Sequence, residues 1–322
     1  MHGGRLAFQV SILATLTAMS AGSSFAQTAS PIGRAYATAN GLRLHYAHAG
    51  QGKLMLFLHG FPEFWYEWRN QLGEFGRDHH AVAPDQRGYN LSDKPAEVDQ
   101  YRVSVLVEDV RALAEQLNSG RPFVLVGHDW GGVVAWAFAM THPVLVETLV
   151  IVNAPHPGVF DRELANNPAQ QEASQYMLIF RSPAAESALS ANGHAALLQI
   201  FEPLEREGHW TEADRRAYLD AWSQPGALTG GLNYYRAARV GPPVDGRRTS
   251  LGESVDPARF LVRVPTLVIW GEQDTALLTG NLIGLEAFVP DLTIHRIPTG
   301  SHWVVQEQPA TVNRLIREFL AR

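Results

Sequence analysis

The chain has 322 residues, of which 46% are hydrophobic and 18% are charged, and its formal net charge is -6. This composition is typical of a globular protein with a sizeable core, and the length leaves room for an inserted or second domain. No basic run stands out, so nucleic acid is not an expected partner. The absence of cysteine excludes disulfides, cysteine-based metal sites and a cysteine nucleophile.

Residues 1–26 have the pattern of a secretory signal peptide. Arg5 precedes a long run of small and apolar residues, and Ser24 and Ala26 provide the small residues of a cleavage site. The run contains several polar residues and is short for a membrane span, so cleavage is favoured over retention as an anchor. We therefore expect a secreted or periplasmic protein with no stable membrane association after cleavage.

Beyond this segment, short apolar runs alternate with helical patterns. Residues 42–46 alternate apolar and polar side chains, which predicts an early antiparallel strand. Several later runs are apolar at successive positions, as in strands that are buried on both faces of a sheet. These runs are residues 54–58, 81–83, 123–126, 149–152, 267–270 and 293–297, with helical stretches such as 103–117 and 132–141 between them. The alternation predicts an α/β fold with a mostly parallel sheet flanked by helices.

The alternation stops between residues 155 and 256. No strand-like run occurs there, and the apolar residues have helix-compatible surroundings. We predict that this region is a helical cap inserted between two strands of a core formed by residues 27–154 and 257–322.

One motif carries the chemistry. The strand at residues 123–126 leads into GHDWGG (127–132) and then into a helix, which is the layout of a nucleophile elbow with small residues on both sides of its apex. The apex residue is Asp129, and no GxSxG pattern occurs in the chain. A carboxylate is already ionised near neutral pH, and it can displace a leaving group at saturated carbon to form an alkyl ester.

Hydrolysis of such an ester requires a general base and an oxyanion hole. Asp274 and His302 each follow a predicted strand, in the expected chain order of nucleophile, acid and histidine. Asp274 would orient the ring of His302, and His302 would activate water. The backbone N–H groups of Phe61 and Trp130 would form the oxyanion hole.

The chain resembles the epoxide hydrolase branch of the α/β-hydrolase family. The matching segments are HGFPEFWYEWRNQ (59–71), DQRGYNLSDKP (85–95), GHDWGG (127–132), NAPHP (153–157), GEQD (271–274) and GSHW (300–303). They occur in the family's order over nearly all of the chain after the signal segment. The resemblance implies an α/β-hydrolase fold with a helical cap after the sixth core strand. No metal-ligand spacing is visible, and we expect no metal or organic cofactor.

The resemblance also implies two cap tyrosines that hydrogen-bond the epoxide oxygen and protonate it as the ring opens. Tyr176 matches the first, and Tyr235 matches the second, with Tyr234 as the alternative. A phenol is a suitable acid for the alkoxide that leaves. The expected reaction converts a small-molecule epoxide to a vicinal diol through an ester on Asp129.

Three residues are candidates for the substrate pocket: Trp130, Phe61 and His156. His156 is expected more strongly to order the entry to the cap. Structural roles are expected for His59, for His128, and for an ion pair between Asp85 and Arg87.

Two alternatives remain open. A haloalkane or haloacetate dehalogenase would use the same aspartate nucleophile. Haloalkane dehalogenases need two halide donors, and Phe61 stands where one of them is commonly an asparagine. Haloacetate dehalogenases place an arginine at the position of Trp130 and a His-Trp pair at Tyr176-Met177. A secreted host-acting factor with a non-catalytic role is less favoured, because no matched catalytic position is lost.

Overall fold

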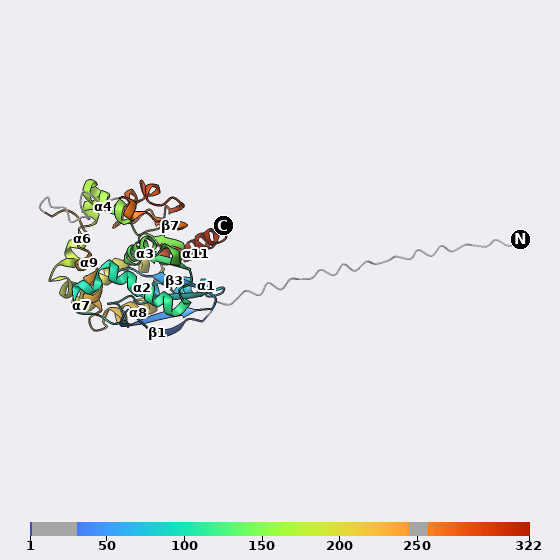
Figure 1. Ribbon diagram of the computed structural model, residues 1–322. Coiled ribbons are helices and arrows are strands. Elements are labelled where there is room, and N and C mark those ends of the chain that lie inside the picture. Colours follow the sequence, from blue (N-terminus) through green and yellow to red (C-terminus); the bar gives the residue numbers. More distant parts are fainter. Residues whose placement is uncertain (2–30, 245–256) are drawn as a thin grey trace.

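The structure is a computed structural model that describes Met1, residues 31–244 and residues 257–322. Apart from Met1, the expected signal segment lies outside the described residues, as does the end of the expected cap. An eight-stranded sheet with the order β1-β2-β4-β3-β5-β6-β7-β8 forms the centre of the molecule (Figure 1). The β1–β2 and β2–β4 pairs are antiparallel and the other pairs are parallel. The predicted α/β-hydrolase fold class is confirmed.

The predicted strands and helices correspond to elements that are slightly longer than the apolar runs. The strands are β1 (Gly33–Ala39), β2 (Leu42–Ala49), β3 (Lys53–Leu58), β4 (His79–Pro84), β5 (Phe123–His128), β6 (Val146–Val152), β7 (Thr266–Gly271) and β8 (Leu292–Ile297). The core helices are α1 (Arg69–Phe75), α2 (Val103–Asn118), α3 (Asp129–Thr141), α10 (Val304–Glu307) and α11 (Pro309–Leu320). The helices between β6 and β7 are α4 (Pro157–Asn166), α5 (Pro168–Ala173), α6 (Tyr176–Arg181), α7 (Ala185–Arg206), α8 (Glu212–Trp222) and α9 (Ala227–Ala238).

Burial explains the continuous apolar runs. All six residues of β5 and all six of β7 are buried, because helices cover both faces of the parallel part of the sheet. Helix α1 packs against α11, and α2 packs against α3. Across the described parts of the chain, no helix is both long enough and apolar enough to cross a lipid bilayer.

The edge strand β1 was not predicted from the sequence. Its buried positions, Ala37 and Ala39, alternate with exposed positions such as Arg34 and Tyr36. Alanine contributes little to a hydrophobic pattern, so the period-two alternation is weak in the sequence. Pairing with β2 along the whole strand supplies the order that the pattern did not reveal.

The predicted ion pair between Asp85 and Arg87 is wrong. The chain turns immediately after β4, so the two side chains separate. The guanidinium group of Arg87 instead donates two hydrogen bonds to Asp109 of α2. Asp85 accepts the backbone N–H of Trp65 at 3.1 Å and lies 2.6 Å from the Nδ1 atom of His45. Both charged groups are therefore structural, but with other partners.

The helices between β6 and β7 are fastened to the core beside the loop that follows β3. In Figure 1, α4, α6, α7 and α9 lie at the end of the molecule that is opposite the C-terminus. The hydroxyl group of Tyr218 in α8 donates to the carboxyl group of Glu63. The indole N–H of Trp222 donates to the carbonyl oxygen of Pro62 at 2.7 Å. These bonds hold the cap helices next to Phe61, which belongs to the same loop.

Candidate active site

Asp129 stands at the sharp turn between β5 and α3. Its φ of 48° is positive, a conformation that is costly for a residue other than glycine and is often found at functional sites. A Cβ atom at Gly131 would lie 2.1 Å from the carbonyl oxygen of Leu58, so the helix approaches β3 only because this residue is glycine. Helix α3 begins at Asp129 itself, three residues earlier than the sequence pattern predicted. The carboxylate therefore lies at the positive end of the helix dipole.

The loop after β3 holds one oxygen of the Asp129 carboxylate. The backbone N–H of Phe61 donates to Oδ1 of Asp129 at 2.8 Å. A Cβ atom at Gly60 would lie only 2.4 Å from the Cβ of Asp129, so a larger residue would push the loop away. Trp130 is in the first turn of α3, where backbone N–H groups have no helical acceptor. One backbone N–H, that of Phe61, is therefore directed at one oxygen of the carboxylate.

Asp274 and His302 are brought together from the loops after β7 and β8. The Nδ1 atom of His302 lies 2.7 Å from Oδ2 of Asp274. The carboxylate of Asp274 also accepts backbone N–H groups of Ala276 and Leu277 at 2.8 and 2.9 Å and the amide of Asn153 at 2.8 Å. Burial alone would raise the pKa of Asp274, but the charge of His302 and these hydrogen bonds hold it below its ordinary value. Asn153 was not singled out as a site residue from the sequence.

The other side of the His302 ring faces the nucleophile. Its Nε2 atom lies 3.8 Å from Oδ2 of Asp129. Burial alone would lower the pKa of His302, but the charge and hydrogen bond of Asp274, together with the charge of Asp129, raise it to about 9. The acidic neighbours therefore favour the protonated form of the His302 ring in the free site.

Tyr176 and Tyr235 reach the same cavity as Asp129 from α6 and α9. Their ring centroids are 6.2 Å apart. Burial and the charge of Asp129 raise the pKa of both phenols well above the ordinary value, so both stay protonated and able to donate. Tyr234 does not line this cavity, and its hydroxyl group donates to the carbonyl oxygen of Arg87 at 3.0 Å. Of the two candidates on α9, the structure favours Tyr235.

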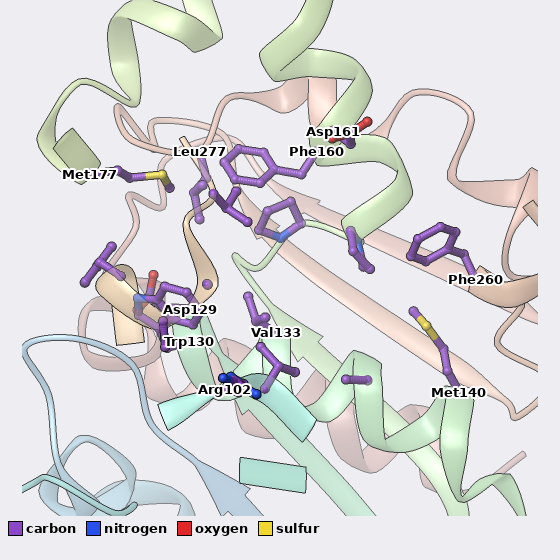
Figure 2. Close-up of a pocket in the computed structure, with 18 of the residues that line it drawn as sticks. Arg102, Asp129, Trp130, Val133, Met140, Phe160, Asp161, Met177, Phe260 and Leu277 are labelled. Carbon is purple, nitrogen blue, oxygen red and sulfur yellow. The ribbon is translucent and has the colours of Figure 1, made fainter. Parts of the chain in front are cut away.

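The cavity has a volume of about 390 Å³ and a mostly apolar wall. Its floor is one side of α3, formed by Trp130, Val133, Ala137 and Met140 at helical spacing. Figure 2 shows Asp129 and Trp130 at one end of the cavity, and Met140 and Phe260 at the other. Ten residues of helix correspond to roughly 15 Å, so the cavity forms a long apolar arm that starts at the nucleophile.

Of the three candidate pocket residues, the structure places only Trp130 in the wall of this cavity. The assignment of His156 to the pocket is wrong. Its ring is buried below the wall, where Nδ1 accepts the N–H of Gly158 and Nε2 lies 2.9 Å from the carbonyl oxygen of Phe260. His156 caps the start of α4 with one ring nitrogen and contacts Phe260, just before β7, with the other, so it orders the entry to the cap.

Phe61 contributes to the site in a different way from that expected of a pocket residue. Its ring packs against Phe180 and Tyr235 at centroid distances of 5.1 and 5.5 Å, and its backbone N–H binds Asp129. In the described part of the chain, no cluster of three or more His, Asp or Glu side chains is arranged to hold a metal ion.

Comparison with known proteins agrees with this geometry. A family model for the alpha/beta hydrolase fold matches residues 53–309. Epoxide hydrolase 4 of Mus musculus is 39% identical over 292 residues, which cover 87% of this chain and 77% of that protein. The AB hydrolase superfamily protein YfhM of Bacillus subtilis (strain 168) is 39% identical over 88% of this chain and 96% of its own. A variant of an epoxide hydrolase from Bacillus megaterium, crystallised with a naphthyloxy-propanediol product, has a TM-score of 0.83 at 39% identity, covering 89% of this chain and 100% of that one.

Proposed function

The chain belongs to the epoxide hydrolase branch of the α/β-hydrolase family, and on this basis we propose that it hydrolyses an epoxide to a vicinal diol through an ester on Asp129. One observation supports this function above all others. The carboxylate of Asp129 is held by the Phe61 N–H and faces a cavity into which two protonated phenols, Tyr176 and Tyr235, also reach. A nucleophile and two acids on one cavity are the groups that opening an epoxide ring requires.

In the first step, one oxygen of Asp129 attacks a ring carbon of the epoxide. The bond between that carbon and the ring oxygen breaks, and Tyr176 or Tyr235 supplies the proton to the oxygen. A phenol is effective here because the leaving group is an alkoxide, which is expelled slowly unless it is protonated. The carboxylate becomes an ester, and its charge is lost.

In the second step, His302 removes a proton from a water molecule, which attacks the ester carbonyl carbon of Asp129. Negative charge develops on the oxygen that the Phe61 N–H already holds, and the Trp130 N–H is the second donor. The intermediate collapses, and the diol leaves with the proton from His302. The second proton of the water remains on the Asp129 carboxyl group and passes to the tyrosinate formed in the first step, so that both the carboxylate and the phenol are restored. Asp274 keeps the ring in the correct tautomer and stabilises its charged form.

The shape of the cavity suggests the class of epoxide. The apolar arm extends from Asp129 along α3, whereas Phe61, Phe180 and Tyr235 pack against one another beside the nucleophile. An epoxide with one long apolar substituent fits this arrangement. The relative from Bacillus megaterium is bound to a diol that carries a single naphthyloxy group, which is a product of this shape.

A dehalogenase needs side-chain donors for the halide that leaves. The indole ring of Trp130 packs edge-on against the ring of Tyr235 at a centroid distance of 5.0 Å, and Phe61 has no side-chain donor. The geometry therefore favours an epoxide over a halide.

Two measurements on the purified protein test this function. A panel of terminal epoxides and haloalkanes of equal length should give diol and no halide. A single turnover in oxygen-18 water should place the label in the carboxylate of Asp129, because water attacks the ester at its carbonyl carbon. Halide release, or an unlabelled carboxylate with a labelled diol, would contradict the proposal.

Export is also part of the proposal, on the composition of residues 1–26 alone. A single positive charge at Arg5 is followed by an apolar run and small residues at Ser24 and Ala26. Fractionation of producing cells should yield a chain that begins at Gln27 in the periplasm or the medium. A chain that keeps residues 1–26 and remains in the cytosol would contradict export.

A further inference from the structure

Glu67 is a buried acid that the reaction described above does not use. It lies in the short helix Trp65–Trp68, just after the loop that carries Phe61, and only 1% of the residue is exposed. Its Oε1 atom is 2.6 Å from the Nδ1 atom of His128, the residue that precedes the nucleophile. Its Oε2 atom accepts the backbone N–H of Gly60 at 3.4 Å. One side chain thus joins the loop after β3 to the end of β5.

The second nitrogen of His128 fixes the position of its proton. The Nε2 atom lies 2.9 Å from the carbonyl oxygen of His302. A carbonyl oxygen only accepts, so Nε2 carries the hydrogen and donates it. In a neutral ring Nδ1 is then bare, and a contact of 2.6 Å with a carboxylate would bring two acceptors together. Among the described residues neither atom has a hydrogen-bond partner as placed, and a hydrogen bond can form across this contact only if Glu67 provides the proton.

An ion pair between a charged His128 and an ionised Glu67 would contain the same number of protons. Each side chain is only 1% exposed, and among the described residues the carboxyl group has one hydrogen bond, the long one from Gly60. Burying two charges with so few partners costs more than their attraction returns. The directions of the pKa shifts agree with a neutral pair. Burial, and then the charge of Asp129, raise the pKa of Glu67 well above its ordinary value. Burial, and then the charge of His302, lower the pKa of His128 to about 3.

We propose that Glu67 is a positioning residue for the catalytic base and acts as a protonated carboxylic acid that donates to His128. This donation fixes the tautomer in which the His128 Nε2–H holds the backbone of His302. The base is thereby kept at its distance of 3.8 Å from Asp129. The proposal rests on the proposed function only for the role of His302; the position of the proton is independent of it.

The arrangement has an electrostatic consequence. An ionised Glu67 would stabilise the charged form of His302 and raise the pKa of its ring, so the base would be neutral less of the time. A neutral carboxyl group gives the same geometry without this charge. The pair therefore orients the base and leaves the charges of Asp129 and Asp274 to control its protonation.

Two substitutions at Glu67 test the proposal. A glutamine has the shape of a protonated glutamate: its NH₂ group can donate to Nδ1 of His128, and its oxygen can accept from Gly60. Glu67→Gln should keep the rate constant of ester hydrolysis within about threefold of wild type. Glu67→Leu leaves Nδ1 buried without a donor, and should slow ester hydrolysis by about tenfold or more while ester formation stays near wild type. Rapid quenching and mass measurement of the Asp129 peptide separate the two steps.

The outcomes divide clearly. If ester hydrolysis slows equally in both variants, an ion pair is required. If ester hydrolysis keeps its wild-type rate constant in both, Glu67 has no positioning role. Either result overturns the proposal. Nitrogen-15 NMR of the His128 ring in the wild-type protein provides a test that needs neither turnover nor a variant that folds. One protonated and one bare nitrogen support the proposal, whereas two protonated nitrogens refute it. If no epoxide is turned over, this measurement still shows where the proton between Glu67 and His128 lies. Failure of the proposed function can therefore be distinguished from failure of this proposal.

Discussion

The Nε2 atom of His302 lies 3.8 Å from the Oδ2 atom of Asp129, which is beyond hydrogen-bond distance. The ring therefore faces the carboxyl group without a direct hydrogen bond to it. A base in this position can act on the ester of Asp129 through one water molecule. Asp129 can form its ester without help from this ring, whereas hydrolysis of the ester depends on it. The two steps should respond differently to changes at His302.

Replacing His302 with glutamine should trap the ester. The nucleophile and the cap tyrosines remain, so the ester should form, whereas loss of the general base should slow its hydrolysis by about 10²- to 10⁴-fold. Mass spectrometry after mixing with an epoxide should find one substrate mass added to the Asp129 peptide. His142→Gln, at the end of α3 with its side chain 24% exposed, is the matched control and should turn over normally. Continued turnover by His302→Gln without an adduct would rule out the scheme.

The pH dependence should differ between the two steps. The pKa of His302 is raised to about 9 in the free site partly by the charge of Asp129, and that charge disappears when the ester forms. The pKa of the ring should therefore be lower in the ester than in the free enzyme. The ring is a base only when neutral, so ester hydrolysis should slow as the pH falls through this lower value, with a midpoint below 9.

Rapid quenching across a pH series checks this expectation. The fraction of enzyme present as ester should rise as the pH falls, because ester formation uses the Asp129 carboxylate and continues. An ester that accumulates only toward alkaline pH, or a hydrolysis midpoint at or above 9, would contradict the assignment of His302 as the base.

The two cap tyrosines should share the protonation of the epoxide oxygen. Tyr176→Phe or Tyr235→Phe should each slow ester formation by about tenfold or more, and the double variant by about 10²- to 10⁴-fold. Tyr234→Phe is the control, because its hydroxyl group binds the carbonyl oxygen of Arg87 outside the cavity. It should cost about 1 kcal/mol of unfolding free energy and leave ester formation unchanged. Stopped-flow fluorescence measures the rates, and a loss in Tyr234→Phe that matched Tyr235→Phe would reverse the assignment.

The sequence was sufficient where a local pattern and the sheet topology determine position. Apolar runs marked the buried strands β5 and β7, and loops that follow neighbouring parallel strands must meet at one edge of the sheet. This reasoning anticipated that Asp129, Asp274 and His302 lie together, and the structure places them so. The start of α3 was missed because glycines at the turn conceal the first helical residues.

Side chains whose partners come from distant segments could not be placed in this way. Tyr234 and Tyr235 are neighbours on one helix and point about 100° apart, so only packing decides which of them faces the cavity. The partner of Glu67 lies 61 positions further along the chain, at His128, and no spacing rule connects them. In the sequence this glutamate resembles a solvated residue between aromatic ones. Its burial becomes visible only when the loop after β3 is folded onto the end of β5.

The apolar arm of the cavity should determine chain-length preference. If an alkyl substituent lies along α3, kcat/KM for 1,2-epoxyalkanes should rise by up to about fourfold for each added methylene, because burying a methylene contributes about 0.8 kcal/mol. The rise should end when the chain fills the roughly 15 Å of the arm. Ala137→Phe blocks the arm two turns beyond Trp130 and should abolish the rise while 1,2-epoxybutane remains a substrate. Thr141→Phe, at an exposed position on the same helix, is the control and should keep the wild-type trend. Loss of activity that is equal for all chain lengths in Ala137→Phe would show that the substituent lies elsewhere.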